Sequence, residues 1–148
     1  MELDDFFPYR LAVTSETFSR NLAQVYVEEL GLSREEWRLL FLLARAGRLT
    51  SVDLARRTTL DKVQVSRASQ RLEGKGLITR DVPDQDRRLR EYTCTDAGQR
   101  LFEQALPRVN AAAAMMLATL DPQDRAALER GVGALLAALR PGEGQGPD

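Results

Sequence analysis

Basic and amide side chains follow one another at helical spacing in the middle of the chain. Gln64, Arg67 and Arg71 are separated by steps of three and four residues, and Lys62 lies just before them. A glutamine amide can pair with adenine through two hydrogen bonds, and an arginine guanidinium can pair with guanine in the same way. Lysine and arginine also bind phosphate groups. This pattern favours nucleic-acid contacts, with Gln64 and Arg67 at base edges and Lys62, Arg71 and Lys75 at phosphates, although it also fits an exposed helix face without a partner.

The positive charge of the chain is concentrated in the same region. The whole sequence carries 21 Lys and Arg against 22 Asp and Glu, which gives a formal net charge of −1. Residues 45–100 alone contain 13 Lys and Arg against 8 Asp and Glu. On composition alone, such an excess also fits an ordinary solvated surface. The order of the residues therefore has to distinguish the two interpretations.

The use of cysteine and histidine excludes most catalytic and metal-binding chemistry. The sequence contains one cysteine, Cys94, and no histidine. Zinc sites built from cysteine and histidine and all histidine-dependent triads are thereby excluded. The sequence also has no Gly-rich phosphate loop and no nucleophile beside a base. We therefore expect no enzymatic activity, no metal site and no cofactor.

The length and hydropathy of the chain are typical of one water-soluble domain. With 148 residues, of which 43% are hydrophobic, the chain can bury a core of its own. It has no run of about eighteen apolar residues, which a membrane helix requires. Glu2, Asp4 and Asp5 give it an acidic start, unlike a signal peptide. We therefore expect a cytoplasmic protein.

Two helices are predicted before the basic region. Apolar residues recur at steps of three and four over about residues 9–29, which predicts one long helix. Ser33, with Glu36 three residues later, has the arrangement of a capping box. The second helix should therefore begin at about residue 34. It should end near Gly47, because glycine permits a left-handed turn.

A helix-turn-helix unit is predicted next. Thr50 caps a short helix that runs to about Arg57, and residues 58–59 form a turn. The following helix, about residues 60–74, has apolar residues on one side and basic residues on the other. Two such helices joined by a short turn form the unit whose second helix enters a major groove of DNA.

An extended segment and two further helices complete the predicted order. Residues 77–82 and 89–94 have the pattern of two strands, and the residues between them form a turn, which predicts a β-hairpin. Thr95 caps a helix that is interrupted or bent at Pro107. A last helix begins at Asp121-Pro122 and continues to about residue 140. The Gly- and Pro-containing end, residues 141–148, is predicted to be disordered.

Three short segments resemble one family of bacterial proteins. Residues 72–80 (LEGKGLITR), 86–88 (DRR) and 95–98 (TDAG) are similar, at these spacings, to the MarR family of winged helix-turn-helix transcription regulators. In that family they form the end of the recognition helix, the wing and the start of the next helix. The resemblance extends over nearly the whole chain.

The resemblance implies a fold that is mainly α-helical with a small β-hairpin wing. A single MarR-like domain would contain a winged helix-turn-helix over about residues 34–100. Helices over about residues 8–30 and 101–140 would flank it and form a homodimer. A two-fold dimer places two recognition helices about one turn of DNA apart, so that it reads a near-palindromic operator.

The function implied is that of a sequence-specific regulator, acting as a homodimeric repressor on double-stranded DNA. In the wing, Arg88 can enter a minor groove, and Asp86 can hold its guanidinium in a bidentate pair. Thr50 and Ser51 can bind a phosphate at a helix N-terminus, although capping is an equally good role for Thr50. The predicted DNA contacts are Thr50, Ser51, Lys62, Gln64, Ser66, Arg67, Arg71, Lys75, Asp86, Arg87, Arg88 and Arg90.

Members of this family often respond to small aromatic or phenolic ligands, and the resemblance implies such an effector. Phe18, Trp37, Arg38 and Phe41 are candidates to line its cleft, although aromatic residues at helical spacing also form cores. Cys94 stands in the second wing strand, where the family usually has an aliphatic residue. A small buried hydrophobic role is favoured there over a redox switch.

Three other interpretations stay open from the sequence. The protein can be a regulator that lacks a ligand pocket and is controlled only by its own concentration. The winged helix can serve as a protein-interaction module without specific DNA binding, with a partner docked on the terminal helices. The terminal helices can also pack within their own subunit instead of forming a dimer. Affinity for duplex DNA separates the protein-interaction module from a DNA-binding regulator.

Overall fold

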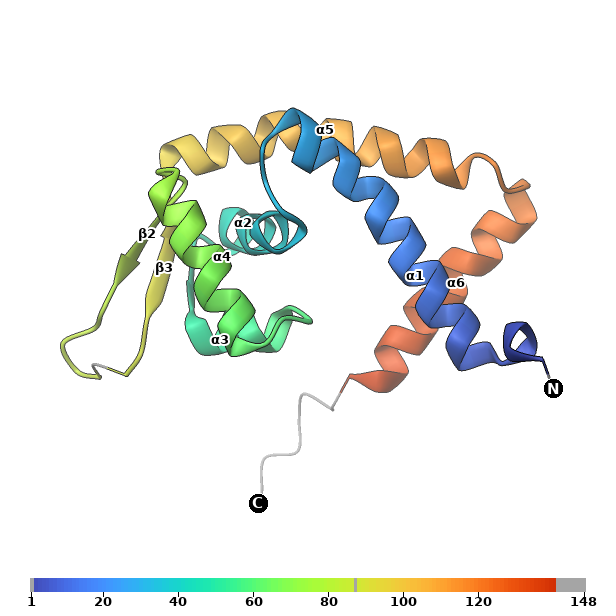
Figure 1. The fold of residues 1–148 in the computed structure, drawn as a ribbon, viewed down its shortest axis with the longest axis horizontal. Coiled ribbons are helices and arrows are strands. Elements are labelled where there is room, and N and C mark those ends of the chain that lie inside the picture. Colours follow the sequence, from blue (N-terminus) through green and yellow to red (C-terminus); the bar gives the residue numbers. More distant parts are fainter. Residues whose placement is uncertain (1, 87, 141–148) are drawn as a thin grey trace, which may run out of the picture. The chain divides into compact units, whose positions relative to one another are not determined.

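The computed structural model describes residues 2–86 and 88–140. Its helices and strands follow the predicted order, and Figure 1 shows them along the chain. The elements are the 3-10 turn η1 (Leu3–Asp5), α1 (Phe7–Gln24), the π-helical turn η2 (Val25–Glu29), α2 (Arg34–Ala46), β1 (Arg48–Thr50), α3 (Ser51–Arg57), α4 (Lys62–Gly74), β2 (Ile78–Asp81), β3 (Glu91–Cys94), α5 (Asp96–Leu117) and α6 (Pro122–Leu139).

Capping side chains fix the starts of the helices where the sequence places them. The Ser33 hydroxyl accepts the backbone N–H of Glu36 at 3.1 Å, and Glu36 accepts that of Ser33 at 2.9 Å, so the predicted capping box is confirmed. Thr50 caps α3, and the Thr95 hydroxyl accepts the N–H of Gly98 at 3.0 Å. Such caps satisfy N–H groups that have no partner inside a helix.

The sheet contains one strand that the sequence analysis missed. Its order is β1-β3-β2, and both pairings are antiparallel, with Leu49 opposite Tyr92 and Ile78 opposite Cys94. The predicted hairpin is the β2–β3 pair, whose strands are shorter than expected. The third strand, β1, is only three residues long and pairs with residues more than forty positions away.

Two helix predictions need correction. The first helix ends at Gln24 and continues as the π-helical turn η2, which includes the buried Tyr26. Pro107 does not interrupt α5, which is one helix from Asp96 to Leu117. Proline removes one helical hydrogen bond, but Ala105 and Val109 on either side of it are buried and hold the helix in place.

One hydrophobic core supports the helix-turn-helix. It joins Leu39, Leu40 and Leu43 of α2 to Leu54 of α3 and Leu72 of α4, all fully buried. Four aromatic rings extend this core towards η2 and α5. Trp37 stacks on Tyr26 with ring centroids 5.6 Å apart, and its centroid lies 5.8 Å from that of Phe102; Phe41 meets Phe102 edge to face at 5.4 Å.

The described residues form two compact units, one up to Ala112 and one from Ala113 onward. The first contains the three-stranded sheet and the predicted winged helix, and Figure 1 shows α2, α3 and α4 gathered beside the β2–β3 hairpin. The mainly α-helical winged-helix fold is thereby confirmed. The predicted disordered end, residues 141–148, lies outside the described residues.

Candidate functional site

The recognition helix α4 separates its buried and exposed side chains as predicted. It contacts α2, α3 and β2, and its inward face is formed by Val65, Ala68, Ser69 and Leu72. The predicted DNA-contacting residues on this helix are all exposed, namely Lys62, Gln64, Ser66, Arg67 and Arg71. The helix therefore offers a polar, basic surface to solvent.

The side chain of Gln64 has a second role in the structure. Its Oε1 accepts the backbone N–H of Asp61 at 3.0 Å, while the backbone N–H of Gln64 donates to Asp61 Oδ1 at 2.8 Å. These two bonds form a capping box at the start of α4. A bidentate pair with adenine needs both ends of the glutamine amide. Gln64 would have to give up the cap to read a base, which leaves Arg67 as the stronger candidate.

The sequence analysis missed two exposed residues of α4, Val63 and Gln70. Successive residues of an α-helix are about 100° apart around its axis. Val63, Arg67 and Gln70 therefore lie on the side of α4 opposite its buried face. Val63 is 57% exposed. Val63 and Gln70 lie four and three residues from Arg67, so helical spacing identifies both of them. The prediction omitted them because it relied mainly on charge. We call Val63, Arg67 and Gln70 the outward line of α4.

The start of α3 uses its polar groups within the protein. The Thr50 hydroxyl donates to Asp53 Oδ2 at 2.9 Å and accepts the Asp53 N–H at 3.1 Å. The hydrogen bond from this hydroxyl holds the pKa of Asp53 below its usual value. The Ser51 N–H donates to the carbonyl oxygen of Arg90 at 2.9 Å. Capping is therefore the observed role of Thr50.

The wing presents its charged residues near the loop between β2 and β3. Asp86 Oδ1 accepts the backbone N–H of Arg88 at 3.0 Å. This carboxylate therefore stabilises the turn through the backbone, whereas the prediction was a bidentate pair with the Arg88 guanidinium. The Arg88 side chain is exposed, and Arg90 is half-buried. Arg87 lies outside the described residues.

Lys75, at the end of α4, lies in an ion pair. Its Nζ donates to Glu36 Oε2 at 2.8 Å and to the carbonyl oxygen of Gly31 at 2.7 Å. Glu36 is only 2% exposed. This arrangement, which we call the Glu36–Lys75 clamp, connects the end of the recognition helix to the start of α2. The phosphate contact of Lys75 stays a prediction, and the clamp is a competing use of the same ammonium group.

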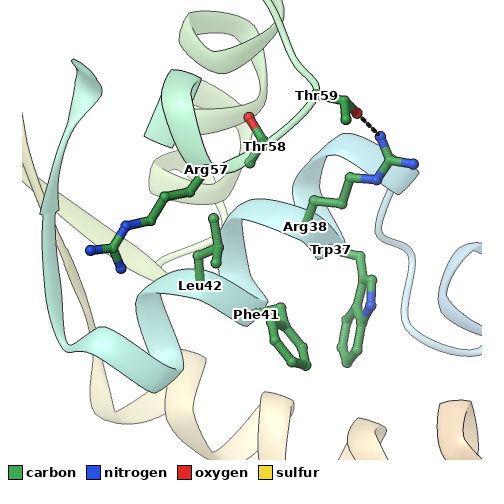
Figure 2. Close-up of a pocket in the computed structure, with 7 residues that line it drawn as sticks. All are labelled: Trp37, Arg38, Phe41, Leu42, Arg57, Thr58 and Thr59. Atoms are coloured by element: carbon green, nitrogen blue, oxygen red, sulfur yellow. Dashed lines mark hydrogen bonds between the residues drawn. The ribbon is translucent and has the colours of Figure 1, made fainter. Parts of the chain in front are cut away.

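An open cleft of about 350 Å³ lies between α2 and the segment that joins α3 to α4 (Figure 2). Trp37 and Phe41 lie on one side of it, and the guanidinium groups of Arg38 and Arg57 lie at opposite ends. The cleft is lined by Trp37, Arg38, Phe41, Leu42, Arg57, Thr58 and Thr59. Of the four predicted ligand residues, three line this cleft, whereas Phe18 of α1 does not.

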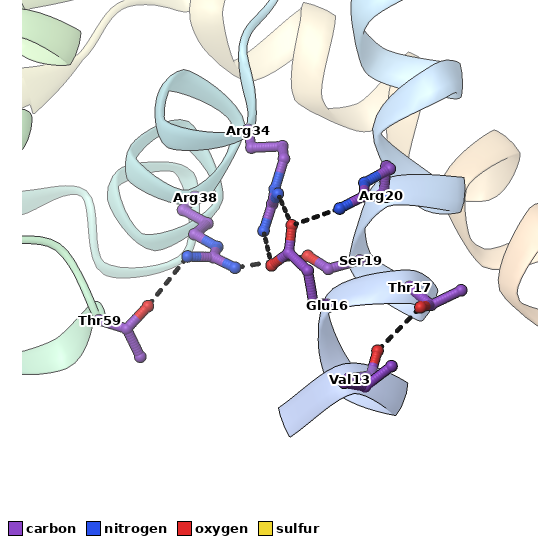
Figure 3. Close-up of polar contacts among 8 residues, drawn as sticks. All are labelled: Val13, Glu16, Thr17, Ser19, Arg20, Arg34, Arg38 and Thr59. Atoms are coloured by element: carbon purple, nitrogen blue, oxygen red, sulfur yellow. Dashed lines mark hydrogen bonds and ion pairs between the residues drawn. The ribbon is translucent and has the colours of Figure 1, made fainter. Parts of the chain in front are cut away.

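Arg38 also connects α1 to the segment before the recognition helix (Figure 3). It donates to Thr59 Oγ1 at 2.9 Å and to Ser19 Oγ at 3.5 Å. Beside it, Arg34 forms a two-bond ion pair with Glu16 at 2.9 and 3.2 Å. The Arg34 hydrogen bond lowers the pKa of Glu16. A group that draws Arg38 into the cleft would disturb contacts with both Ser19 and Thr59.

The thiol of Cys94 is half-buried in β3, where Sγ lies 3.5 Å from the Thr95 carbonyl oxygen. Burial and then the charge of Asp96 raise its pKa. A raised pKa keeps a thiol protonated, whereas oxidation and nucleophilic attack use the thiolate. These contacts favour the predicted packing role.

The part of the chain that the structure describes has neither a metal-ion site nor a membrane-spanning helix. No group of His, Cys, Asp and Glu in residues 2–86 and 88–140 has an arrangement that could hold a metal ion. None of the helices in this part of the chain has both the length and the apolar character of a membrane span.

The chain is similar in sequence to known transcription regulators. Residues 30–89, which begin just after η2 and end in the loop between β2 and β3, match the model of the MarR family. The HTH-type transcriptional regulator YdgJ of Bacillus subtilis (strain 168) is 29% identical over 95 residues, which cover 64% of this chain and 58% of YdgJ. The chain thus spans little more than half the length of that curated relative.

Solved structures of similar fold cover nearly the whole chain. A MarR family regulator from Silicibacter pomeroyi is 27% identical with a TM-score of 0.73, and the match covers 96% of this chain and 95% of that chain. Sco3205, a MarR family regulator from Streptomyces coelicolor solved in complex with DNA, has a TM-score of 0.79 at 21% identity, covering 98% and 93%. The winged-helix fold, the matched segment and these likenesses agree: the chain is similar to the MarR family of winged helix-turn-helix transcription regulators.

Proposed function

We propose that this protein is a homodimeric repressor that binds double-stranded DNA at a near-palindromic operator. The observation that carries the proposal is the outward face of α4, where Arg67 stands opposite the buried residues and the exposed Lys62 and Arg71 lie on the same helix. The wing adds the exposed Arg88. In helix-turn-helix proteins the N-terminal residues of the second helix contact base edges.

Similarity to the MarR family supports this assignment. Sco3205 was solved in complex with DNA, and the similarity of Sco3205 to this chain is one of fold. It supports the proposal because the same fold, with a recognition helix and a wing, can be placed against DNA. In this chain, residue chemistry at those two elements is suited to the same use.

The homodimer is supported by apolar residues left exposed on α6. Leu128, Val132, Leu135, Leu136 and Leu139 recur at helical spacing and are 37–71% exposed, and no described residue of α6 is buried. We call these five residues the α6 stripe. Leaving such a surface in water is unfavourable, and a second copy of the chain is the proposed cover. Two copies would also give the symmetry that a near-palindromic operator requires.

Selection of bound sites from a random duplex library is the experiment that tests this function. An enriched inverted repeat, with half-sites about one helical turn apart, is the expected result. No enrichment, together with no affinity for any duplex, would contradict the proposal and favour the protein-interaction module.

Replacing Arg67 with alanine should weaken operator binding about 30-fold or more. A bidentate pair with a base contributes about 1–3 kcal/mol, and a dimer makes it in both half-sites. The loss should be accompanied by relaxed preference at one base pair in each half-site. Fluorescence anisotropy with the selected operator and its single-base variants measures both effects.

Lys62→Ala is the matched control for Arg67→Ala. Lys62 is exposed on the same helix but is assigned to phosphate, so its replacement should weaken binding to all duplexes alike. If Arg67→Ala also weakens all sequences equally, or leaves affinity unchanged, the assignment of Arg67 to a base edge is wrong.

We further propose that a small aromatic acid binds in the cleft and releases the operator. Trp37 and Phe41 provide an apolar wall, and Arg38 and Arg57 provide positive charge for an anionic group. The volume of about 350 Å³ is at the lower end of small-molecule sites. Because Arg38 also holds Ser19 and Thr59, an anion at its guanidinium would loosen the link between α1 and the segment before α4.

Replacing Arg38 with glutamine should weaken binding of aromatic carboxylates about tenfold and leave neutral aromatic amides unaffected. Charge-assisted hydrogen bonds are stronger than neutral ones, which is the reason for the difference. Trp37 is the one tryptophan of the chain, so its fluorescence reports on the cleft directly. A panel of benzoates and matching benzamides provides the ligands. Equal affinity of both proteins for benzoates, or no saturable change in emission, would contradict an anion site at Arg38.

A further inference from the structure

Val63 is an apolar residue at a place where neither folding nor helix formation calls for one. It is the second residue of α4 and is 57% exposed, whereas Val65 and Leu72 of the same helix are buried. Valine is also a weaker helix former than alanine, because its branched side chain loses rotamer freedom. Its presence therefore gains the isolated protein little.

The spacing of Val63 and Arg67 along α4 is close to the rise of two base pairs in DNA. The two residues are four positions apart, so they lie on the same side of α4 and are about 6 Å apart along its axis. That distance is close to the rise of two base pairs in DNA, at about 3.4 Å each. If Arg67 reaches a base edge, Val63 lies near a base about two positions away.

The chemistry of the major groove leaves one partner for such a side chain. Valine has no hydrogen-bond donor or acceptor, and the one apolar group that base pairs present in that groove is the C5 methyl of thymine. A cytosine there would present its amino group to a side chain that cannot accept a hydrogen bond, which is unfavourable. The contact would therefore favour thymine over cytosine.

We propose that Val63 is a specificity-determining residue that contacts the methyl group of one thymine in each half-site. This inference rests on the proposed DNA-binding function. It adds to that function a base preference that does not come from charge. The operator should carry thymine about two positions from the base pair whose preference Arg67→Ala relaxes.

Replacement of thymidine by deoxyuridine tests the contact, because it removes the methyl group and preserves all base-pair hydrogen bonds. Each thymidine of the selected operator is replaced in turn, in both half-sites, and the Kd is measured by anisotropy. At one symmetric position the native protein should lose about fivefold or more in affinity. Val63→Ala should bind the thymidine and deoxyuridine duplexes there with equal affinity.

Val52→Ala is a matched control. Val52 is also the second residue of its helix, α3, and is 59% exposed, but it does not lie on α4. This variant should keep the deoxyuridine sensitivity of the native protein. The inference is overturned if no single replacement weakens native binding, or if Val63→Ala keeps the same sensitivity. Failure of the proposed function would appear earlier and differently, as an absence of any enriched operator.

Discussion

Gly98→Ala is expected to lower the free energy of unfolding by about 3 kcal/mol or more, the upper end of the range for overpacked sites. Gly98 is buried in the first turn of α5. A Cβ there would overlap the carbonyl oxygen of Leu77 and would lie 2.9 Å from Cys94 Sγ. The carbonyl belongs to the backbone and already accepts the N–H of Thr95 at 3.1 Å, so it cannot turn aside.

Urea unfolding at a fixed protein concentration measures this effect, with Gly74→Ala as the control. Gly74 is the last residue of α4, and a Cβ added there meets nothing within 4 Å. Its replacement should be neutral or stabilising by about 0.5 kcal/mol, because alanine restricts the unfolded chain. Equal stability of the two variants would show that α5 can move away from the sheet, contrary to the contacts described.

Val132→Glu is expected to convert a dimer into monomers and to abolish high-affinity operator binding. Val132 lies within the α6 stripe and is 52% exposed in the single chain. A glutamate at that position is harmless in a monomer, but in a dimer it would bury an unpaired charge in each subunit. Several kcal/mol per buried charge corresponds to a rise in the dimer Kd of about a thousandfold or more. Operator binding would fall with it, because one subunit reads only one half-site.

Sedimentation velocity and anisotropy with the selected operator measure the two consequences. Ala137→Glu provides the control, because Ala137 is also exposed but lies on the opposite side of α6 from Val132. This variant should sediment as native dimer, at twice the chain mass of 16.6 kDa. A Val132→Glu protein that remains dimeric would mean that the α6 stripe is covered in some other way or not at all.

The features that could be predicted from the sequence are the local ones. Ser33, Thr50 and Thr95 cap their helices because each hydroxyl reaches an N–H only three residues away. The amphipathic pattern of α4 likewise depends on neighbours three and four residues apart. Within the segment 95–98, Gly98 was noted only as part of a resemblance, and the structure gives it a physical reason, since it leaves room for the Leu77 carbonyl.

The features that could not be predicted depend on residues distant in sequence. The strand β1 exists because Leu49 pairs opposite Tyr92, and a three-residue strand has no periodicity of its own. Lys75 meets Glu36 across 39 positions, which a reading of charge along the chain does not reveal. The capping role of Gln64 was missed for a different reason: Asp61 and Gln64 have the spacing of a capping box, but the helix was expected to begin before them.

The Glu36–Lys75 clamp has a consequence for the way binding responds to electrolyte. Cationic side chains that neutralise DNA phosphates release condensed counterions, and each such contact adds about 0.9 to the slope of log K against log salt concentration. Lys75 is already paired with a buried carboxylate, so a dimer would have two fewer cations ready to take part in this exchange. Its operator affinity should therefore depend less steeply on ionic strength than the number of basic residues on the binding surface implies. The ion pair at the end of α4 is therefore also expected to moderate the sensitivity of DNA binding to salt.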